Sequence, residues 1–205
     1  MNNKLVMIKV VMYENTIRNI IMITKKLKEN RKIALYCGGL FLILIVWLAM
    51  RAAELSALSL LKLTLLIIFS YIAMIMDILN KKISNKLILV MLIVWMLLIL
   101  PLSLCDTQVG IRELTDALLG LLTGGGLFLL VYLINRKGLG GGDVKLMAAV
   151  GLYLGFANTL PAILYGTVLA ALFGLVLLLA RKIGSKDTMP LAPFMFVGIM
   201  ITLFT

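Results

Sequence analysis

The sequence contains no histidine, and this absence excludes several common kinds of active site. A serine–histidine nucleophile pair and a zinc protease site built on two histidines both need the imidazole ring. Only two cysteines are present, Cys37 and Cys105, near the ends of different apolar runs. Two isolated thiols form neither a zinc site nor a disulfide framework. Catalysis by this chain would therefore rely on other side chains.

Acidic residues are also scarce, with nine Asp and Glu against 20 Lys and Arg in 205 residues. Hydrophobic residues make up 62% of the chain, whereas a soluble domain is about half apolar. This composition predicts an all-α polytopic integral membrane protein. In such a protein a net charge of +11 reflects topology and anionic lipid rather than nucleic acid. Membrane lipid is thus an expected partner, and nucleic acid is not.

The apolar residues fall into seven runs, and runs near twenty residues fit membrane-spanning helices. The runs cover residues 33–50, 58–76, 87–104, 114–134, 144–156, 162–180 and 189–204. A polar turn is expected over 78–86, a short loop from Asp106 to Glu113, and a break at Asn158 and Pro161. We predict a basic amphipathic segment on the cytoplasmic membrane surface over residues 1–32. One extra N-terminal helix over 33–50 would precede a six-span core over 55–205.

The distribution of Lys and Arg predicts the orientation of these spans. With residues 1–32 inside, eight basic residues lie there and three lie in each of the three later inner segments. These segments hold 17 of the 20 basic residues, and only Arg51, Lys62 and Arg112 lie outside. Because basic residues concentrate in cytoplasmic segments, we expect a multi-pass protein of the cell inner (plasma) membrane with a cytoplasmic N-terminus.

Two carboxylates, Asp77 and Asp143, lie at the predicted cytoplasmic ends of apolar runs. Asp77 ends the second run, and Asp143 opens the fifth run after the glycine-rich residues 138–142. An ionisable residue at membrane depth is costly and is a functional-site hypothesis by default. We therefore expect the two carboxylates to face each other at one depth.

A pair of close carboxylates shares one proton near neutral pH, because both do not ionise easily together. One can act as a base on a water molecule while the other donates a hydrogen bond to a peptide carbonyl. This is the chemistry of aspartic proteases, and it needs neither histidine nor a metal ion.

Other interpretations of the two residues remain open. Asp77 can be an interfacial boundary residue with Lys81 as a local partner, and Asp143 can be a helix N-cap. The pair can also bind protons or cations in a small membrane transporter with a broken-helix site. A non-catalytic membrane assembly factor is a third possibility.

The residues around Asp143 resemble a segment of a known family. Gly140-Gly141-Gly142-Asp143 is a GxGD motif followed by Val-Lys. It is similar to the second catalytic segment of the type IV prepilin peptidases, a branch of the GxGD membrane aspartic proteases.

Two further segments carry the same resemblance, which extends from about residue 58 to 204. After Asp77 come two lysines and then Ile-Ser-Asn at 83–85, where the family has Ile-Pro-Asn, so that Ser84 replaces the proline. The last run contains Pro190-Leu-Ala-Pro193-Phe, which resembles the family's closing Pro-x-x-Pro-Phe segment.

The resemblance implies a catalytic pair of Asp77 and Asp143 and no cofactor. The substrates it implies are pilin, pseudopilin or archaeal-flagellin-like precursors, whose leader is cut at the cytoplasmic membrane face. Many members also methylate the new N-terminus and carry a zinc-binding cysteine loop. This chain lacks those cysteines and that loop, so it resembles the compact form, and the resemblance leaves methylation open.

Several nearby residues are candidates for shaping the site. They are Gly140, Gly142, Lys145, Asn85 and Pro193. Lys145 can tune the carboxylates or extend to the headgroups, and Asn85 can cap the third span or order the site.

Four glycines form two small-x-x-x-small pairs, Gly120 with Gly124 and Gly151 with Gly155. Such pairs allow helices to pack closely. We expect the second pair to let the helices of the two aspartates approach each other.

Overall fold

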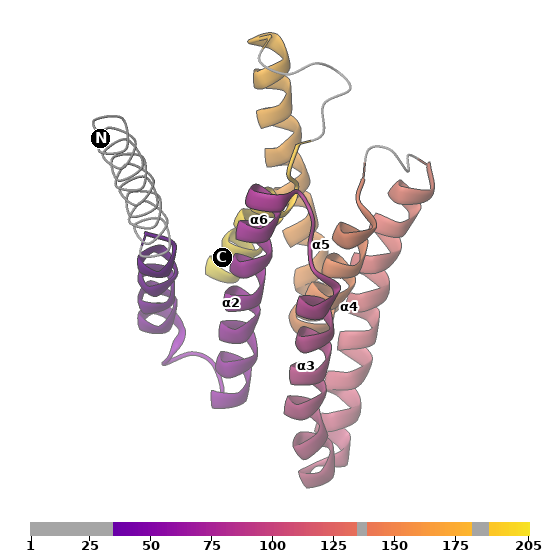
Figure 1. Ribbon diagram of the computed structural model, residues 1–205. Coiled ribbons are helices and arrows are strands. Elements are labelled where there is room, and N and C mark those ends of the chain that lie inside the picture. The colour runs from indigo at the N-terminus through magenta and orange to yellow at the C-terminus, as the bar shows by residue number, and fades with distance from the viewer. Residues whose placement is uncertain (1–34, 135–138, 182–188) are drawn as a thin grey trace, which may run out of the picture. The chain divides into compact units, whose positions relative to one another are not determined.

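The computed structural model describes residues 35–134, 139–181 and 189–205. The basic segment predicted over residues 1–32 lies outside the described residues. The chain divides into two compact units, residues 1–46 and 47–205, and the second contains both candidate aspartates. Figure 1 shows the helices of this second unit.

The described residues form six helices and no strand, which confirms the predicted all-α class. They are Leu35–Arg51, α2 (Ala57–Asn80), α3 (Asn85–Cys105), α4 (Thr107–Ile134), α5 (Gly141–Leu179) and α6 (Ala192–Phe204). Three of them, α2, α4 and α5, are long and apolar enough to cross a membrane. Each of the seven predicted runs lies within one of these helices or overlaps it, and α5 covers the run 144–156 and all but the last residue of the run 162–180.

Short polar side chains set the beginnings of α2, α3 and α4. The Ser56 hydroxyl accepts a hydrogen bond from the Ser59 amide, and the Ser84 hydroxyl accepts one from the Lys86 amide. Asp106 Oδ1 accepts bonds from the Gln108 and Val109 amides at 3.0 and 3.1 Å. Such side chains satisfy amides that have no partner inside the helix.

The prediction of a loop from Asp106 to Glu113 is therefore wrong, because α4 begins at Thr107. Asp106 starts this helix, and its polar first turns continue directly into the apolar run. The connection between α3 and α4 is correspondingly very short.

α5 contains two helices that meet at a sharp bend. Gly155 has φ 73° and ψ 179°, which is not helical and is open almost only to glycine. Met147 and Thr159, about 18 Å apart in a straight helix, both lie against Gly124 of α4. The chain therefore turns back at Gly155, as the course of α5 in Figure 1 also shows.

The bend lies earlier than the break predicted at Asn158 and Pro161, both of which lie within the second half of α5. Asp116 Oδ1 accepts a hydrogen bond of 2.9 Å from the Phe156 amide. This carboxylate of α4 therefore satisfies an amide at the start of the second half. The contact explains why the turn forms at Gly155.

The paired glycines join α4 to α5, and not the helices that carry the two aspartates. A side chain at Gly120 would overlap the Gly151 carbonyl, and one at Gly151 would overlap the Gly120 carbonyl. The two backbones thus touch, which small residues permit. The expected role of Gly151 and Gly155 in bringing the aspartate helices together is wrong, because these residues face α4.

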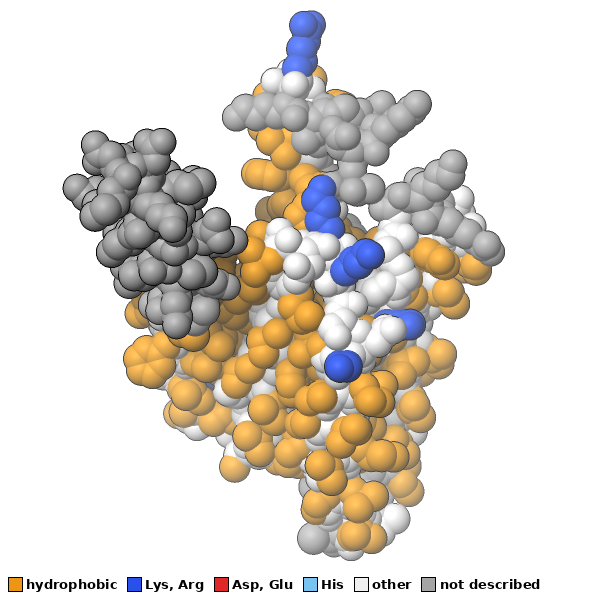
Figure 2. Space-filling model, viewed as in Figure 1, with side chains coloured by type: hydrophobic (Ala, Val, Ile, Leu, Met, Phe, Trp, Pro, Cys, Tyr) orange, Lys and Arg blue, Asp and Glu red, His pale blue; other side chains and the backbone are white. Residues whose placement is uncertain are grey.

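α6 packs against both α5 and α2, and so closes the bundle near Asp77. Met195 and Ile199 of α6 are buried, and Gly198 lies against the Ala162 carbonyl. On the surface, large apolar side chains are exposed along all the described helices. Figure 2 shows them as a wide band, with Lys and Arg mostly in the more polar area above it. This distribution fits a protein that lies in lipid.

Candidate active site

Asp77 lies near the end of α2 and is buried, with 6% of its surface exposed. Its Oδ2 atom accepts a hydrogen bond of 3.0 Å from the backbone N–H of Ala192, the first residue of α6. Pro193 follows in the first turn of α6. Amides in a first turn have no partner inside the helix, so the missing N–H of proline costs nothing there, and its fixed φ favours the helix. The start of α6 therefore holds the Asp77 carboxylate.

Asp143 lies in the first turn of α5, and its carboxylate interacts electrostatically with that of Asp77. Gly140 is the N-cap of α5, and its backbone group hydrogen-bonds the Asp143 carboxylate. Asp143 is thus the third residue inside the helix and reaches back to the cap, as the acidic residue of a capping box does. The alternative of Asp143 as the N-cap itself is wrong, because Gly140 has that position.

The glycines of the motif differ in what surrounds them. A Cβ at Gly140 would lie 3.0 Å from Oδ2 of Asp143, whereas one at Gly141 would meet nothing within 4 Å. A Cβ at Gly142 would lie 3.4 Å from Cβ of Ile83, an ordinary contact. Gly140 therefore leaves space for the carboxylate, and Gly142 places the start of α5 beside the turn between α2 and α3.

Asn85 and Lys145 connect the starts of α3 and α5. Lys145 Nζ donates a hydrogen bond of 3.2 Å to Asn85 Oδ1, and both side chains are exposed. The cap of α3 is Ser84, whose hydroxyl accepts from the Lys86 amide at 3.2 Å. Asn85 therefore does not cap α3, and its side chain holds the α5 lysine instead.

The Ala192 amide is the one polar group of the site for which the sequence gives little signal. A backbone N–H is present at almost every position, and only the neighbouring Pro193 indicates that a helix begins here. The site combines two carboxylates, two backbone donors and the Lys145–Asn85 hydrogen bond. The residues that supply these groups belong to α2, α3, α5 and α6 or to their caps. Such paired carboxylates can share a proton and activate water.

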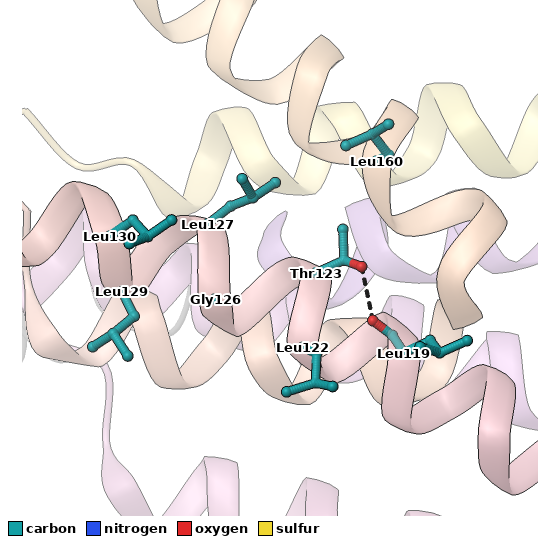
Figure 3. A pocket seen from close by; sticks show the side chains of 8 residues that line it. All are labelled: Leu119, Leu122, Thr123, Gly126, Leu127, Leu129, Leu130 and Leu160. Atoms are coloured by element: carbon teal, nitrogen blue, oxygen red, sulfur yellow. Dashed lines mark hydrogen bonds between the residues drawn. The ribbon is translucent and has the colours of Figure 1, made fainter.

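No cluster of three or more His, Cys, Asp or Glu side chains lies together in the part of the chain that the structure describes. An apolar groove of about 540 Å³ between α4 and α5 is lined by neither aspartate, and Figure 3 shows its lining. Its lining is Leu119, Leu122, Thr123, Gly126, Leu127, Leu129, Leu130 and Leu160. It offers no group for acid–base chemistry.

The described residues thus define an all-helical protein with long apolar helices and a candidate site that contains two aspartates. A model of the Type IV leader peptidase family matches residues 64–175, a little over half of the chain, including both aspartates. The chain belongs to this family.

Curated relatives agree with this assignment. The chain is 35% identical over 75 residues to the prepilin leader peptidase/N-methyltransferase of Bacillus subtilis, covering 36% of this chain and 30% of the relative. It is 33% identical over 106 residues to the enzyme of that name in Escherichia coli, covering 48% and 45%. It is 35% identical over 98 residues to leader peptidase HopD of Salmonella typhimurium, covering 44% and 63%.

The match spans about a third of the length of the Bacillus subtilis relative. No solved structure matches the chain. The family supports a peptidase that processes leader peptides.

Proposed function

We propose that this protein is a membrane aspartic endopeptidase that cleaves the leader peptide from type IV pilin-like precursors. The observation that carries the proposal is the electrostatic pairing of Asp77 with Asp143 in a chain of the leader peptidase family. The pairing joins the end of α2 to the start of α5, 66 positions apart in the sequence. The transporter interpretation has no comparable support.

In the proposed reaction, one carboxylate of the pair is ionised and accepts a proton from a water molecule. The oxygen of this water attacks the scissile carbonyl carbon. The other carboxyl group, which carries the shared proton, donates a hydrogen bond to the carbonyl oxygen. The tetrahedral intermediate then collapses, the C–N bond breaks, and the leaving nitrogen takes up a proton. One water is consumed, and the products are a carboxylate and a new N-terminus.

The proposed site lies at the cytoplasmic face of the inner (plasma) membrane. This follows from the excess of Lys and Arg in the segments beside both aspartates. The proposed substrates are pilin, pseudopilin or archaeal-flagellin-like precursors with a leader before an apolar helix. Seven spans with a cytoplasmic N-terminus belong to the same proposal.

The decisive experiment is leader cleavage in membranes that contain the full chain and a co-expressed pilin-like precursor. The wild type, Asp77→Asn and Asp143→Asn would be compared by gel shift and by the mass of the new N-terminus. Asp106→Asn is a matched control, because asparagine still caps a helix and Asp106 is exposed at the start of α4. We expect cleavage by the wild type and the control, and a loss of at least about a hundredfold in either site variant.

Equal processing by Asp77→Asn and Asp143→Asn would contradict the aspartic mechanism. Absence of processing by the wild type, with several precursors tried, would contradict the proposed function and return attention to proton- or cation-coupled transport. A new N-terminus heavier by a further 14 Da would show methylation, because a methyl group that replaces a hydrogen adds the mass of CH₂.

A further inference from the structure

The chain leaves α2 in a sharp turn about one helical turn after Asp77. Lys81 has φ 51° and ψ 30°, in the left-handed region, and its amide donates a hydrogen bond of 2.8 Å to the Asp77 carbonyl. A left-handed residue at this position ends a helix and turns the chain away from its axis. The short connection of residues 81–84 then leads into α3 and therefore stays close to Asp77.

This connection and the start of α3 lie against the start of α5. A Cβ at Gly142 would lie 3.4 Å from Ile83 Cβ, 3.7 Å from the Ile83 carbonyl oxygen and 3.8 Å from its amide nitrogen. Lys145 Nζ donates a hydrogen bond of 3.2 Å to Oδ1 of Asn85, the first residue of α3. Gly142 precedes Asp143, and Lys145 follows it by two residues. One apolar and one polar contact thus join the two chain segments that carry the aspartates.

The aspartates need such a link, because two close carboxylates repel each other whenever both are ionised. The Ala192 amide joins Asp77 to α6, and the Gly140 backbone joins Asp143 to the cap of its own helix. Neither of these hydrogen bonds sets the separation of α2 from α5. Lys145 lies nearly opposite Asp143 on α5, since two positions along a helix differ by about 200°. A bond from this side restrains rotation of the first turn of α5.

We propose that Lys145 and Asn85 are positioning residues that act as one unit and hold the Asp143 carboxylate at its reacting distance from Asp77. This inference rests on the proposed function, and it adds two residues on which the rate depends without contact with the scissile bond. A single exposed hydrogen bond contributes only modestly to stability. A small displacement of a reacting group, in contrast, lowers the rate steeply. Loss of the bond should therefore lower kcat more than it changes KM or unfolding.

The positive charge of Lys145 could affect the site by itself, and such a role would not involve Asn85. Lys145→Met removes both the charge and the hydrogen bond, whereas Asn85→Ala removes only the bond. If the bond is what matters, each single change already removes it completely, so the double variant is no slower than Lys145→Met. If the two residues acted independently, the two losses would multiply.

The test measures steady-state cleavage of a pilin-like precursor by the full chain in proteoliposomes. We expect Lys145→Met, Asn85→Ala and the double variant each to lower kcat about fivefold with KM nearly unchanged, because the carboxylate is displaced only slightly. Lys145→Arg keeps a donor and should retain most of the wild-type kcat. Lys86→Met is the matched control, since it removes an exposed lysine beside Asn85 and leaves the bond intact. Full kcat in Asn85→Ala, multiplied losses in the double variant, or an equal loss in Lys86→Met would overturn the inference.

A distance measurement tests the link without cleavage. In a chain whose two native cysteines are serine, spin labels would be attached at Lys82→Cys in the connection and at Gly141→Cys at the start of α5, where an added Cβ meets nothing within 4 Å. We expect the distance distribution from electron paramagnetic resonance to broaden in Lys145→Met and Asn85→Ala and to stay unchanged in Lys86→Met. An unchanged distribution in the first two variants would overturn the inference. Absence of wild-type cleavage with broadened distributions would contradict the proposed function and support the link between the helices.

Discussion

At the scale of single residues, each candidate carboxylate is held by the backbone at the start of a helix. The Ala192 amide at the start of α6 donates to Asp77, and Gly140 at the start of α5 hydrogen-bonds Asp143. Helix N-termini carry a partial positive charge that stabilises nearby anions. This arrangement lets a bundle with few charged groups keep two acidic residues in one place, and the first residues of α5 and α6 therefore position the site.

We predict that Gly140→Ala lowers kcat about tenfold, while Gly141→Ala has little effect, because small displacements of a reacting group cost rate steeply. The new methyl group at position 140 would lie 3.0 Å from Oδ2 of Asp143 and push the carboxylate aside. The backbone of Gly140, at φ −78° and ψ 139°, suits alanine, so the effect comes from this contact. At position 141 the methyl group meets nothing within 4 Å.

Cleavage kinetics of both variants on one precursor, with thermal unfolding as a folding check, measure the difference. Equal activity of the two variants would show that the carboxylate does not need the space at Gly140.

At the scale of helices, apolar runs in the sequence predicted each helix, but a local cap decided where α4 begins and a contact between helices decided where α5 bends. α4 begins at Thr107 because Asp106 caps it, although the polar residues 106–113 resemble a loop. The bend of α5 lies at Gly155 because Asp116 of α4 binds the Phe156 amide there. The Asp106 cap is a local contact, whereas the Asp116 contact joins two helices and leaves no periodic signal along one segment. The two acids of the site were found because a charge in an apolar run is conspicuous, whereas a backbone donor such as Ala192 is not.

The bend at Gly155 makes a second prediction. Gly155→Ala should destabilise the protein by about 1–3 kcal/mol, since φ 73° with ψ 179° is strained for any other residue. The added methyl group would also overlap the Asp116 carboxylate that holds the bend. Gly126→Ala is the matched control in α4, because no atom lies within 4 Å of its new methyl group. In a helix this change should stabilise by up to about 1 kcal/mol.

Thermal unfolding in detergent micelles compares the two glycine variants. A loss of stability in Gly126→Ala equal to that in Gly155→Ala would show that the bend is not a point of strain.

At the scale of the whole molecule, two contacts of lysine side chains mark the two ends of the helices. Asn85 and Lys145 lie at the end that contains the aspartates. At the other end, Lys62 Nζ of α2 lies 2.7 Å from Glu113 Oε2 of α4. Between these ends the described surface is largely apolar. The chain thus has the pattern of a membrane-embedded bundle, and the distribution of its lysines predicts which end faces the cytoplasm.

This orientation can be measured with single cysteines in a chain whose Cys37 and Cys105 are replaced by serine. α3 joins the connection that contains Lys82 to the connection before α4, so a membrane-spanning α3 places the two connections on opposite sides. We predict that a membrane-impermeant thiol reagent labels Arg112→Cys in intact cells and labels Lys82→Cys only after the membrane is permeabilised. Lys82 is exposed beside the candidate site, and Arg112 is exposed in the first turns of α4. Labelling of both from outside would mean that α3 does not cross, and labelling of Lys82→Cys alone would invert the orientation and place the aspartates away from the cytoplasm.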